Sequence, residues 1–257
     1  MKITVIQPEI FWENKAKNLS LLEELIKPFY YSTDIIVLPE MFTTGFSMNT
    51  INMADGIPSE TIAWLKQIAI GGNLAICGSY IARVKGNYLN RWAFVSPDME
   101  VIYDKRHLFR MSHEEAFFRP GNKRVIFDFR GTRILPSVCY DLRFPVWLRN
   151  KNDYDLLINS ANWPETRRSA WKILLRARAI ENQCFVAASN RIGTDGNNVR
   201  YCGDSVIIDP KGEDLASAQE NKVGSISAEL DMESLHSFRK DFPVLKDADN
   251  FKLFTKK

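Results

Sequence analysis

The sequence predicts a layered α/β fold, with helices on the outside of the β-sheets. Continuous β-branched runs, such as residues 34–38 (DIIVL), alternate with segments of helical period, such as residues 15–26. Such runs are typical of strands that are buried on both faces, and strand–helix–strand order places the helices outside the sheet. Because no linker, low-complexity stretch or repeat interrupts the chain, we expect a single domain over residues 1–257.

The individual elements follow from the same periodicities. Residues 15–26 place Leu19, Leu22 and Ile26 on one helical face, and Pro28 closes that helix. Further helices are expected at residues 59–69, ended by Gly71-Gly72, and at 145–152, 165–182 and from 232 onward. The segments 96–100 (SPDME) and 209–213 (DPKGE) predict hairpin turns. Strands are expected at residues 3–7, 34–38, 74–82, 91–95, 101–103, 134–138, 156–160, 185–189, 205–209 and 224–230.

Composition excludes several classes of protein. The net charge is +3 and no block of basic residues occurs, so nucleic-acid binding is not indicated. No apolar run is long enough to span a bilayer, and the N-terminus is too polar for a secretory signal, so we expect a cytoplasmic protein that does not bind membranes. The four cysteines and three histidines show no metal-ligand spacing, so we expect neither metal nor cofactor. Cys77 and Cys184 lie in apolar runs and are expected to be small buried side chains.

Three predicted strand ends carry residues that suit catalysis. Glu40 follows a buried strand and a proline, Lys105 follows the strand at 101–103, and Cys139 lies between a buried strand and a short helix. In layered α/β folds reactive groups collect at strand ends, where the chain leaves the sheet. Each residue alone has an ordinary alternative: a carboxylate that caps a turn, a surface lysine, or an unreactive buried thiol. Together, on neighbouring strand ends, they supply a base, a cation and a nucleophile.

These residues and their surroundings resemble the nitrilase superfamily of carbon–nitrogen hydrolases. The resemblance runs over nearly the whole chain and is most like the bacterial omega-amidase branch. It rests on LPE at 38–40, DKRHLF at 104–109, CYDLRFP at 139–145, NWP at 162–164, RARAIENQ at 176–183 and NRIG at 190–193. It implies a four-layer α-β-β-α sandwich that forms a homodimer or a higher homo-oligomer.

The resemblance also assigns roles to single residues. It implies Cys139 as the nucleophile, Glu40 as the general base and Lys105 as a cation beside the tetrahedral intermediate. Glu114, seven residues before Gly121, is the implied fourth member, although Glu115 next to it leaves open which carboxylate faces the site. The expected partner is a small amide substrate, such as 2-oxoglutaramate or 2-oxosuccinamate.

Such a half-amide needs a cation for its free carboxylate, and a bidentate arginine suits that task. Arg143 and Arg191 are the candidates. Phe42, Tyr140 and Trp163 follow or abut the catalytic strand ends and are expected to wall the pocket, with ordinary core packing as the alternative.

Three other functions remain open at this point. The enzyme could hydrolyse another small linear amide, such as deaminated glutathione. A Cys–His hydrolase would use His107 or His113 as its base, and substituting that histidine would abolish activity. A catalytically silent binding subunit is a third possibility. A Cys139 thiol that does not react with iodoacetamide at neutral pH would favour it.

Overall fold

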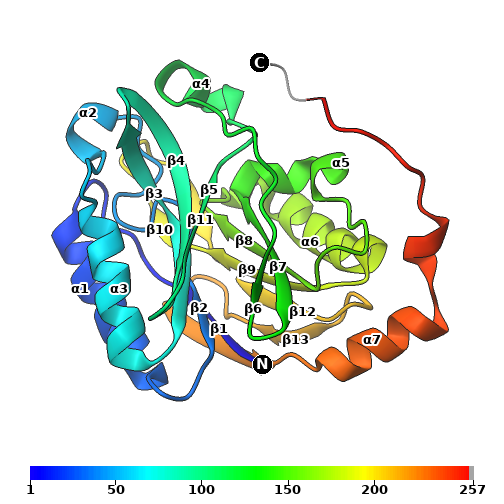
Figure 1. Cartoon of the computed structure of the whole chain (residues 1–257). Helices are drawn as coiled ribbons and strands as arrows, with labels where there is room; N and C mark the ends of the chain where they lie inside the picture. The colour runs from blue at the N-terminus through cyan, green and yellow to red at the C-terminus, as the bar shows by residue number, and fades with distance from the viewer. Residues whose placement is uncertain (255–257) are drawn as a thin grey trace.

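The computed structural model describes residues 1–254, and two six-stranded sheets form its centre. Helices cover the outer face of each sheet, so the layers run helix, sheet, sheet, helix (Figure 1). This is the four-layer arrangement that the resemblance implies. None of the described helices is long and apolar enough to cross a membrane.

The first sheet has the strand order β14-β1-β2-β3-β4-β5. Strands β1, β2 and β3 are parallel, whereas β14, β4 and β5 each pair antiparallel with their neighbours. The parallel strands are connected through α1 (Lys15–Ile26) and α3 (Glu60–Gly72). The strand bounds are β14 Gly224–Glu229, β1 Lys2–Gln7, β2 Ile35–Val37, β3 Ala75–Val84, β4 Asn87–Val95 and β5 Glu100–Asp104.

The second sheet has the order β13-β12-β9-β8-β7-β6, and its centre, β7-β8-β9, is parallel. Helix α5 (Pro145–Leu148) follows β7, and α6 (Arg168–Asn182) connects β8 to β9. The strand bounds are β13 Asp214–Ser217, β12 Val206–Ile208, β9 Phe185–Asn190, β8 Leu156–Ala161, β7 Thr132–Val138 and β6 Phe127–Phe129. The hairpin expected at 209–213 joins β12 to β13.

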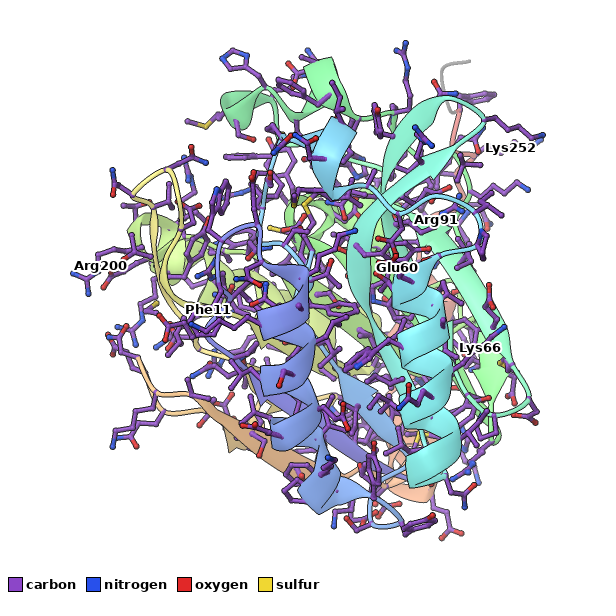
Figure 2. All side chains as sticks on the ribbon, turned by 90° about the vertical axis from the view of Figure 1, so that its left-hand side faces the viewer. Phe11, Glu60, Lys66, Arg91, Arg200 and Lys252 are labelled. Carbon is purple, nitrogen blue, oxygen red and sulfur yellow. The ribbon has the colours of Figure 1, made fainter. Side chains whose placement is uncertain are left out.

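The main core lies between the two sheets. Alternate residues of the first sheet, among them Val5, Val37 and Phe94, pack against second-sheet residues such as Leu157 and Val186. The intervening positions of the first sheet face the other way, because side chains alternate along a strand. Those positions form a separate cluster with α1 and α3, which lie side by side towards the viewer in Figure 2.

Side-chain caps and left-handed residues set the helix ends. The side chains of Asn14 and Ser59 accept backbone N–H bonds at the starts of α1 and α3. Helix α3 ends at Gly72, within the predicted Gly71-Gly72 pair, but the left-handed residue that caps it is Asn73 rather than a glycine. The helix predicted at 145–152 is limited to Pro145–Leu148, and the start of the helix predicted at 165–182 is a 3₁₀ turn, Glu165–Arg167.

The remaining elements are short or lie outside the sandwich. Helix α4 carries the motif residue Glu114 and lies at the upper edge of Figure 1. The ribbon β10–β11 begins just after β9, and its Ile192 forms a β-bridge with Glu9, which follows β1. The helix expected from residue 232 ends at Asp241. Bounds of these elements are α2 Thr50–Met53, α4 Glu114–Phe117, α7 Met232–Asp241, β10 Ile192–Thr194 and β11 Arg200–Cys202.

Candidate active site

The three candidate residues leave their strands at the same end of the sandwich. Glu40 follows β2, Lys105 follows β5 and Cys139 follows β7. We expected three neighbouring strand ends, and this is wrong. Two strands, β3 and β4, separate β2 from β5 in the first sheet, and Cys139 comes from the second sheet. The site is therefore assembled across the interface between the sheets, which sequence order does not reveal.

Lys105 is the electrostatic centre of the site. Its Nζ donates to Oε1 of Glu40 at 2.8 Å and to both carboxylate oxygens of Glu114, at 3.1 and 2.9 Å, and all three side chains are fully buried. Burial lowers the pKa of the Lys105 ammonium, but Glu114 and Glu40 raise it more, so its pKa lies above the usual value. The ammonium therefore stays charged at neutral pH.

Gly121 fixes the backbone next to this lysine. Its N–H donates to the carbonyl of Lys105 at 2.8 Å, and a Cβ at this position would lie 2.0 Å from the carbonyl oxygen of Asp104. Only glycine permits so close an approach of two backbones. The Pro-Gly segment therefore positions Lys105, although it contributes no reactive group.

Glu114, not Glu115, faces the site. Glu114 is fully buried and its Oε2 accepts the backbone N–H of Phe109, whereas Glu115 is exposed on the same helical turn. Burial raises the pKa of Glu114; Lys105 lowers it and Glu40 raises it, and the net pKa is above the usual value. The adjacent pair left the choice open in the sequence, and the direction of α4 decides it.

Two asparagines that the sequence reasoning missed hold Glu40. Nδ2 of Asn90 donates to Oε1 of Glu40 at 2.8 Å and to Oε1 of Glu114 at 3.1 Å. The backbone N–H of Asn162 donates to Oε2 of Glu40 at 3.0 Å, and its side chain donates to the Glu40 carbonyl at 2.6 Å. Asn162 lies in the NWP motif, whereas β4, which also contains Asn87 and Arg91, has no local feature that singles out Asn90.

Cys139 lies on a sharp turn between β7 and the 3₁₀ helix Cys139–Arg143. Its φ of 44° is in the left-handed region, which costs a residue with a Cβ about 1–2 kcal/mol. Nucleophiles are presented in this way on strained strand-to-helix turns. The thiol lies 3.6 Å from the carbonyl oxygen of Asn162. Burial and Glu40 raise the pKa of the thiol well above its usual value, while Lys105 lowers it.

A cavity of about 710 Å³ opens over Cys139 and Lys105. Tyr140, Arg143 and Trp163 line it, in the place that we expected for the pocket walls. The Arg143 guanidinium lies 4.9 Å from the Trp163 ring, and no carboxylate among residues 1–254 forms an ion pair with it. Glu165, which lines the same cavity, pairs with Arg200 at 3.3 Å. Lining residues that we had not singled out include Phe46, Met48, Phe109, Arg167, Asn197, Arg200 and Tyr201 and the carboxylates Glu165 and Asp195.

Two candidate binding residues lie elsewhere. The expectation that Phe42 walls the pocket is wrong: it is fully buried in the cluster beneath α1 and α3, against Gly78 and 5.9 Å from the Trp64 ring. The side-chain direction at the strand end turns it away from Cys139. Arg191 is also buried, and it donates to the backbone carbonyls of Ile10 and Ile192 rather than lining the cavity.

Neither histidine of the alternative Cys–His reading lines this cavity. His107 Nδ1 lies 2.7 Å from Oδ1 of Asp141, and the ring stacks on Phe144. His113 is exposed at the start of α4. The geometry favours the Glu40–Lys105 pair as the partners of Cys139.

The comparisons with known proteins agree with this geometry. The family model for carbon-nitrogen hydrolases matches residues 2–240. The chain is 45% identical to "Omega-amidase YafV" of Escherichia coli K12 over 99% of both chains. It is 34% identical to a 2-oxoglutaramate amidase of Bacillus subtilis, over 95% of this chain and 96% of that protein.

A solved structure is also similar over the whole chain. The CN-hydrolase superfamily protein XC1258 of Xanthomonas campestris superposes with a TM-score of 0.96 at 39% identity, over 99% of both chains, and its crystal structure holds an arsenic adduct in the active site. The two stacked sheets with buried strand ends beneath a cavity thus define a hydrolase of carbon–nitrogen bonds. The chain belongs to the carbon-nitrogen hydrolase family, the nitrilase superfamily, as its sequence motifs predicted.

Proposed function

We propose that this enzyme is an omega-amidase, which hydrolyses the terminal amide of 2-oxoglutaramate or 2-oxosuccinamate to the dicarboxylic keto acid and ammonia. The observation that carries the proposal is Arg143, a guanidinium without a carboxylate partner among the described residues, in the cavity that also contains Cys139. A free arginine inside a cavity suits a substrate carboxylate, which it binds through two parallel hydrogen bonds. The names of the relatives in E. coli and B. subtilis support the same substrate class.

The first half-reaction would form a thioester. Glu40 takes the proton of the Cys139 thiol, and the thiolate sulfur attacks the amide carbon. The buried Lys105 ammonium and the backbone N–H of Tyr140 stabilise the negative charge that develops on the oxygen. The carbon–nitrogen bond then breaks, and Glu40 returns the proton to the nitrogen, which leaves as ammonia.

The second half-reaction would restore the enzyme. Glu40 takes a proton from water, and the resulting hydroxide attacks the thioester carbon. The carbon–sulfur bond breaks, the thiolate regains its proton, and the acid is released. Glu40 is suited to both steps because Lys105, Asn90 and Asn162 hold its carboxylate in one orientation. Glu114 would hold Lys105 from the other side.

A larger substrate is the second candidate, and one observation favours it. The cavity of about 710 Å³ is in the range that takes drug-sized ligands, which are much larger than a five-carbon keto-amide. Arg167 also lines it, with its guanidinium 5.2 Å from the Phe109 ring. A second arginine would suit a distal carboxylate, such as that of a deaminated peptide like deaminated glutathione.

A substrate panel tests both candidates. Product release would be measured with 2-oxoglutaramate, 2-oxosuccinamate, propionamide and deaminated glutathione, with Cys139→Ala as the inactive control. We expect kcat/KM for a keto-amide to exceed that for the neutral amide by about 100-fold, since one charge-assisted pair contributes about 1.5–3 kcal/mol. Equal rates for propionamide and the keto-amides would contradict an omega-amidase, and a preference for deaminated glutathione would favour the second candidate.

A further inference from the structure

Asp141 is a buried carboxylate near the nucleophile that no step of the proposed mechanism uses. It lies two residues after Cys139 and is fully buried. Its Oδ2 accepts the backbone N–H of Val138 at 3.0 Å and the hydroxyl of Tyr103 at 2.7 Å. Its Oδ1 accepts the backbone N–H of His107 at 2.9 Å and lies 2.7 Å from Nδ1 of the same residue.

These four contacts join the two strand ends that carry the site. Val138 is the last residue of β7, directly before Cys139, in the second sheet. Tyr103 belongs to β5 of the first sheet, and His107 follows Lys105 by two residues. One carboxylate therefore links the segment that carries Lys105 to the turn that carries Cys139. Within residues 1–254 no backbone pairing joins β5 to β7, since these two strands belong to different sheets.

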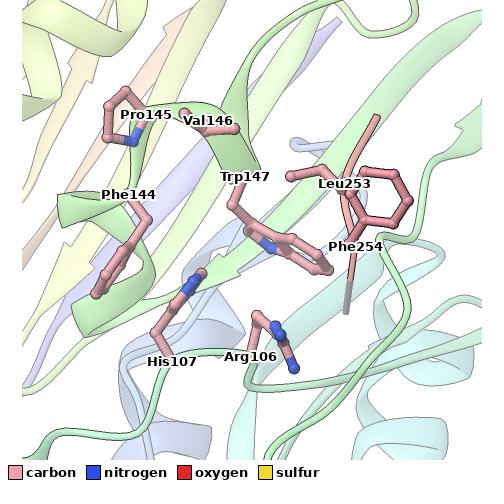
Figure 3. Close-up of a pocket in the computed structure, with 8 residues that line it drawn as sticks. All are labelled: Arg106, His107, Phe144, Pro145, Val146, Trp147, Leu253 and Phe254. Atoms are coloured by element: carbon pink, nitrogen blue, oxygen red, sulfur yellow. The ribbon is translucent and has the colours of Figure 1, made fainter. Parts of the chain in front are cut away.

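The His107 ring packs against two aromatic neighbours. It stacks on Phe144 with centroids 3.7 Å apart and planes 6° apart, and it meets Trp147 edge-on at 5.8 Å. Trp147 in turn donates its indole N–H to the Tyr103 hydroxyl at 3.1 Å. Figure 3 shows His107 between Phe144 and Arg106, on the wall of a small cavity that is separate from the one over Cys139.

The proton of His107 follows from this arrangement. Both oxygens of Asp141 already accept hydrogen bonds from other donors, so we assign the hydrogen between Oδ1 and Nδ1 to the imidazole nitrogen. The ring nitrogen Nδ1 is therefore occupied by its hydrogen bond to Asp141, and the ring does not line the Cys139 cavity. We propose that His107 and Asp141 are positioning residues, which hold the strained turn at Cys139 in register with Lys105, and that His107 does not act as the catalytic base.

Three substitutions test this role, because each changes one property of the His107–Asp141 contact. His107→Phe keeps an aromatic ring against Phe144 but removes the Nδ1 donor. His107→Asn supplies an N–H donor near the position of Nδ1 but has no basic nitrogen. Asp141→Asn keeps the shape of the acceptor and removes its charge. His113→Asn is the matched control, because His113 is exposed and outside the network.

We expect His107→Phe and Asp141→Asn to lower kcat by about 10- to 100-fold with KM within about threefold of wild type, because the reacting groups lose alignment rather than substrate contacts. His107→Asn should recover kcat to within about fivefold of wild type. The rate at which iodoacetamide alkylates Cys139 should differ from the wild-type rate in His107→Phe. In His107→Asn it should return to the wild-type rate. This second readout needs no substrate, so it separates failure of the proposal from failure of the omega-amidase assignment.

Two results would overturn the proposal. Wild-type kcat and alkylation in a folded His107→Phe variant would show that the contact positions nothing. A His107→Asn variant as inactive as His107→Phe would show that the imidazole itself is required, as in a Cys–His hydrolase. Thermal unfolding of each variant establishes that it is folded. If His107→Phe is not folded, His107→Asn alone still shows whether His107 serves as a hydrogen-bond donor to Asp141 or as a catalytic base.

Discussion

Nζ of Lys105 lies 2.8 Å from Oε1 of Glu40, and both side chains are completely buried. Lys105 also contacts Glu114, so two carboxylates share one ammonium. Removing one member of such a buried group leaves an uncompensated charge, which costs about 3–5 kcal/mol. The ion group is therefore a structural unit in addition to its proposed role in the reaction, so the stability of each variant within it should be measured alongside its activity.

The thiol of Cys139 should respond in opposite directions to loss of its two charged neighbours. Glu40 raises the pKa of Cys139 and Lys105 lowers it. Glu40→Gln should therefore increase the thiolate fraction at a given pH, and Lys105→Met should decrease it, by about tenfold per unit of pKa. The measurement is the rate of alkylation by iodoacetamide between pH 7 and 10.

Amidase turnover should fall in both variants even though alkylation changes in opposite senses, because both residues take part in the proposed reaction. Faster alkylation in Lys105→Met would contradict this account. Since burial raises the thiol pKa, slow alkylation of the wild type at neutral pH is also expected of an active enzyme. Alkylation at neutral pH therefore does not identify a silent binding subunit, contrary to our interpretation of the sequence, and turnover has to decide.

Substituting the two adjacent carboxylates of α4, Glu114 and Glu115, should have very different effects on kcat. Glu114→Gln removes one of the two charges that hold the Lys105 ammonium, so kcat should drop by about 10- to 100-fold. Glu115→Gln is the matched control and should leave kcat unchanged, because Glu115 is exposed. Ammonia release by both variants, at substrate concentrations on either side of KM, checks this. A loss in Glu115→Gln equal to that in Glu114→Gln would refute it.

Arg143 should determine affinity for the substrate carboxylate. Arg143→Met keeps a long apolar side chain against Trp163 but removes the charge, so KM for 2-oxoglutaramate should rise by about 10- to 100-fold. Turnover of a neutral amide should not change. Arg176→Met serves as the control, since Arg176 pairs with Asp214 outside the cavity. An equal effect of Arg143→Met on neutral and anionic amides would remove the assigned role.

Asp155 should make the free energy of unfolding decrease as the pH falls into the acid range. Burial raises the pKa of Asp155, but hydrogen bonds from Arg133 and Arg239 lower it more, so its pKa in the folded state is below the usual value. A depressed pKa contributes stability that is complete above the unfolded value, near 3.9, and is lost as the pH falls through the folded value.

The corresponding variant is Asp155→Asn. It should lose about 1–3 kcal/mol of unfolding free energy at pH 7, because the contact with Arg239 attaches α7 to the second sheet. The difference from wild type should begin to shrink below about pH 4, where Asp155 of the unfolded chain takes up a proton, and should disappear once the pH has passed below the depressed pKa of the folded state. Urea unfolding at pH 7 and in acid measures both. A constant difference across this range would exclude Asp155 as the source.

The sequence was sufficient to predict the position of a candidate residue where that position depends only on one strand and the residues that follow it. Glu40, Lys105 and Cys139 each follow an apolar run, and the structure places all three at one end of the sandwich. Family resemblance added Glu114. The sequence did not predict which way a side chain points after the strand ends. Phe42 follows the same strand as Glu40, yet it packs beneath α1 and α3 instead of lining the cavity. Asn90 and Asn162 had no local mark that separates a positioning amide from an ordinary polar residue.

The sequence by itself indicated the strands, the main helices and the candidate reactive groups, because periodicity and strand-end chemistry depend on neighbouring residues. Only the tertiary structure decided which groups meet. Glu40 and Lys105 come from non-adjacent strands of one sheet and Cys139 from the other, and the packing of the two inner faces brings them together. The direction of each side chain at a strand end, and therefore the choice of Glu114 over Glu115 and of Arg143 over Arg191, depends on packing between segments far apart in the chain.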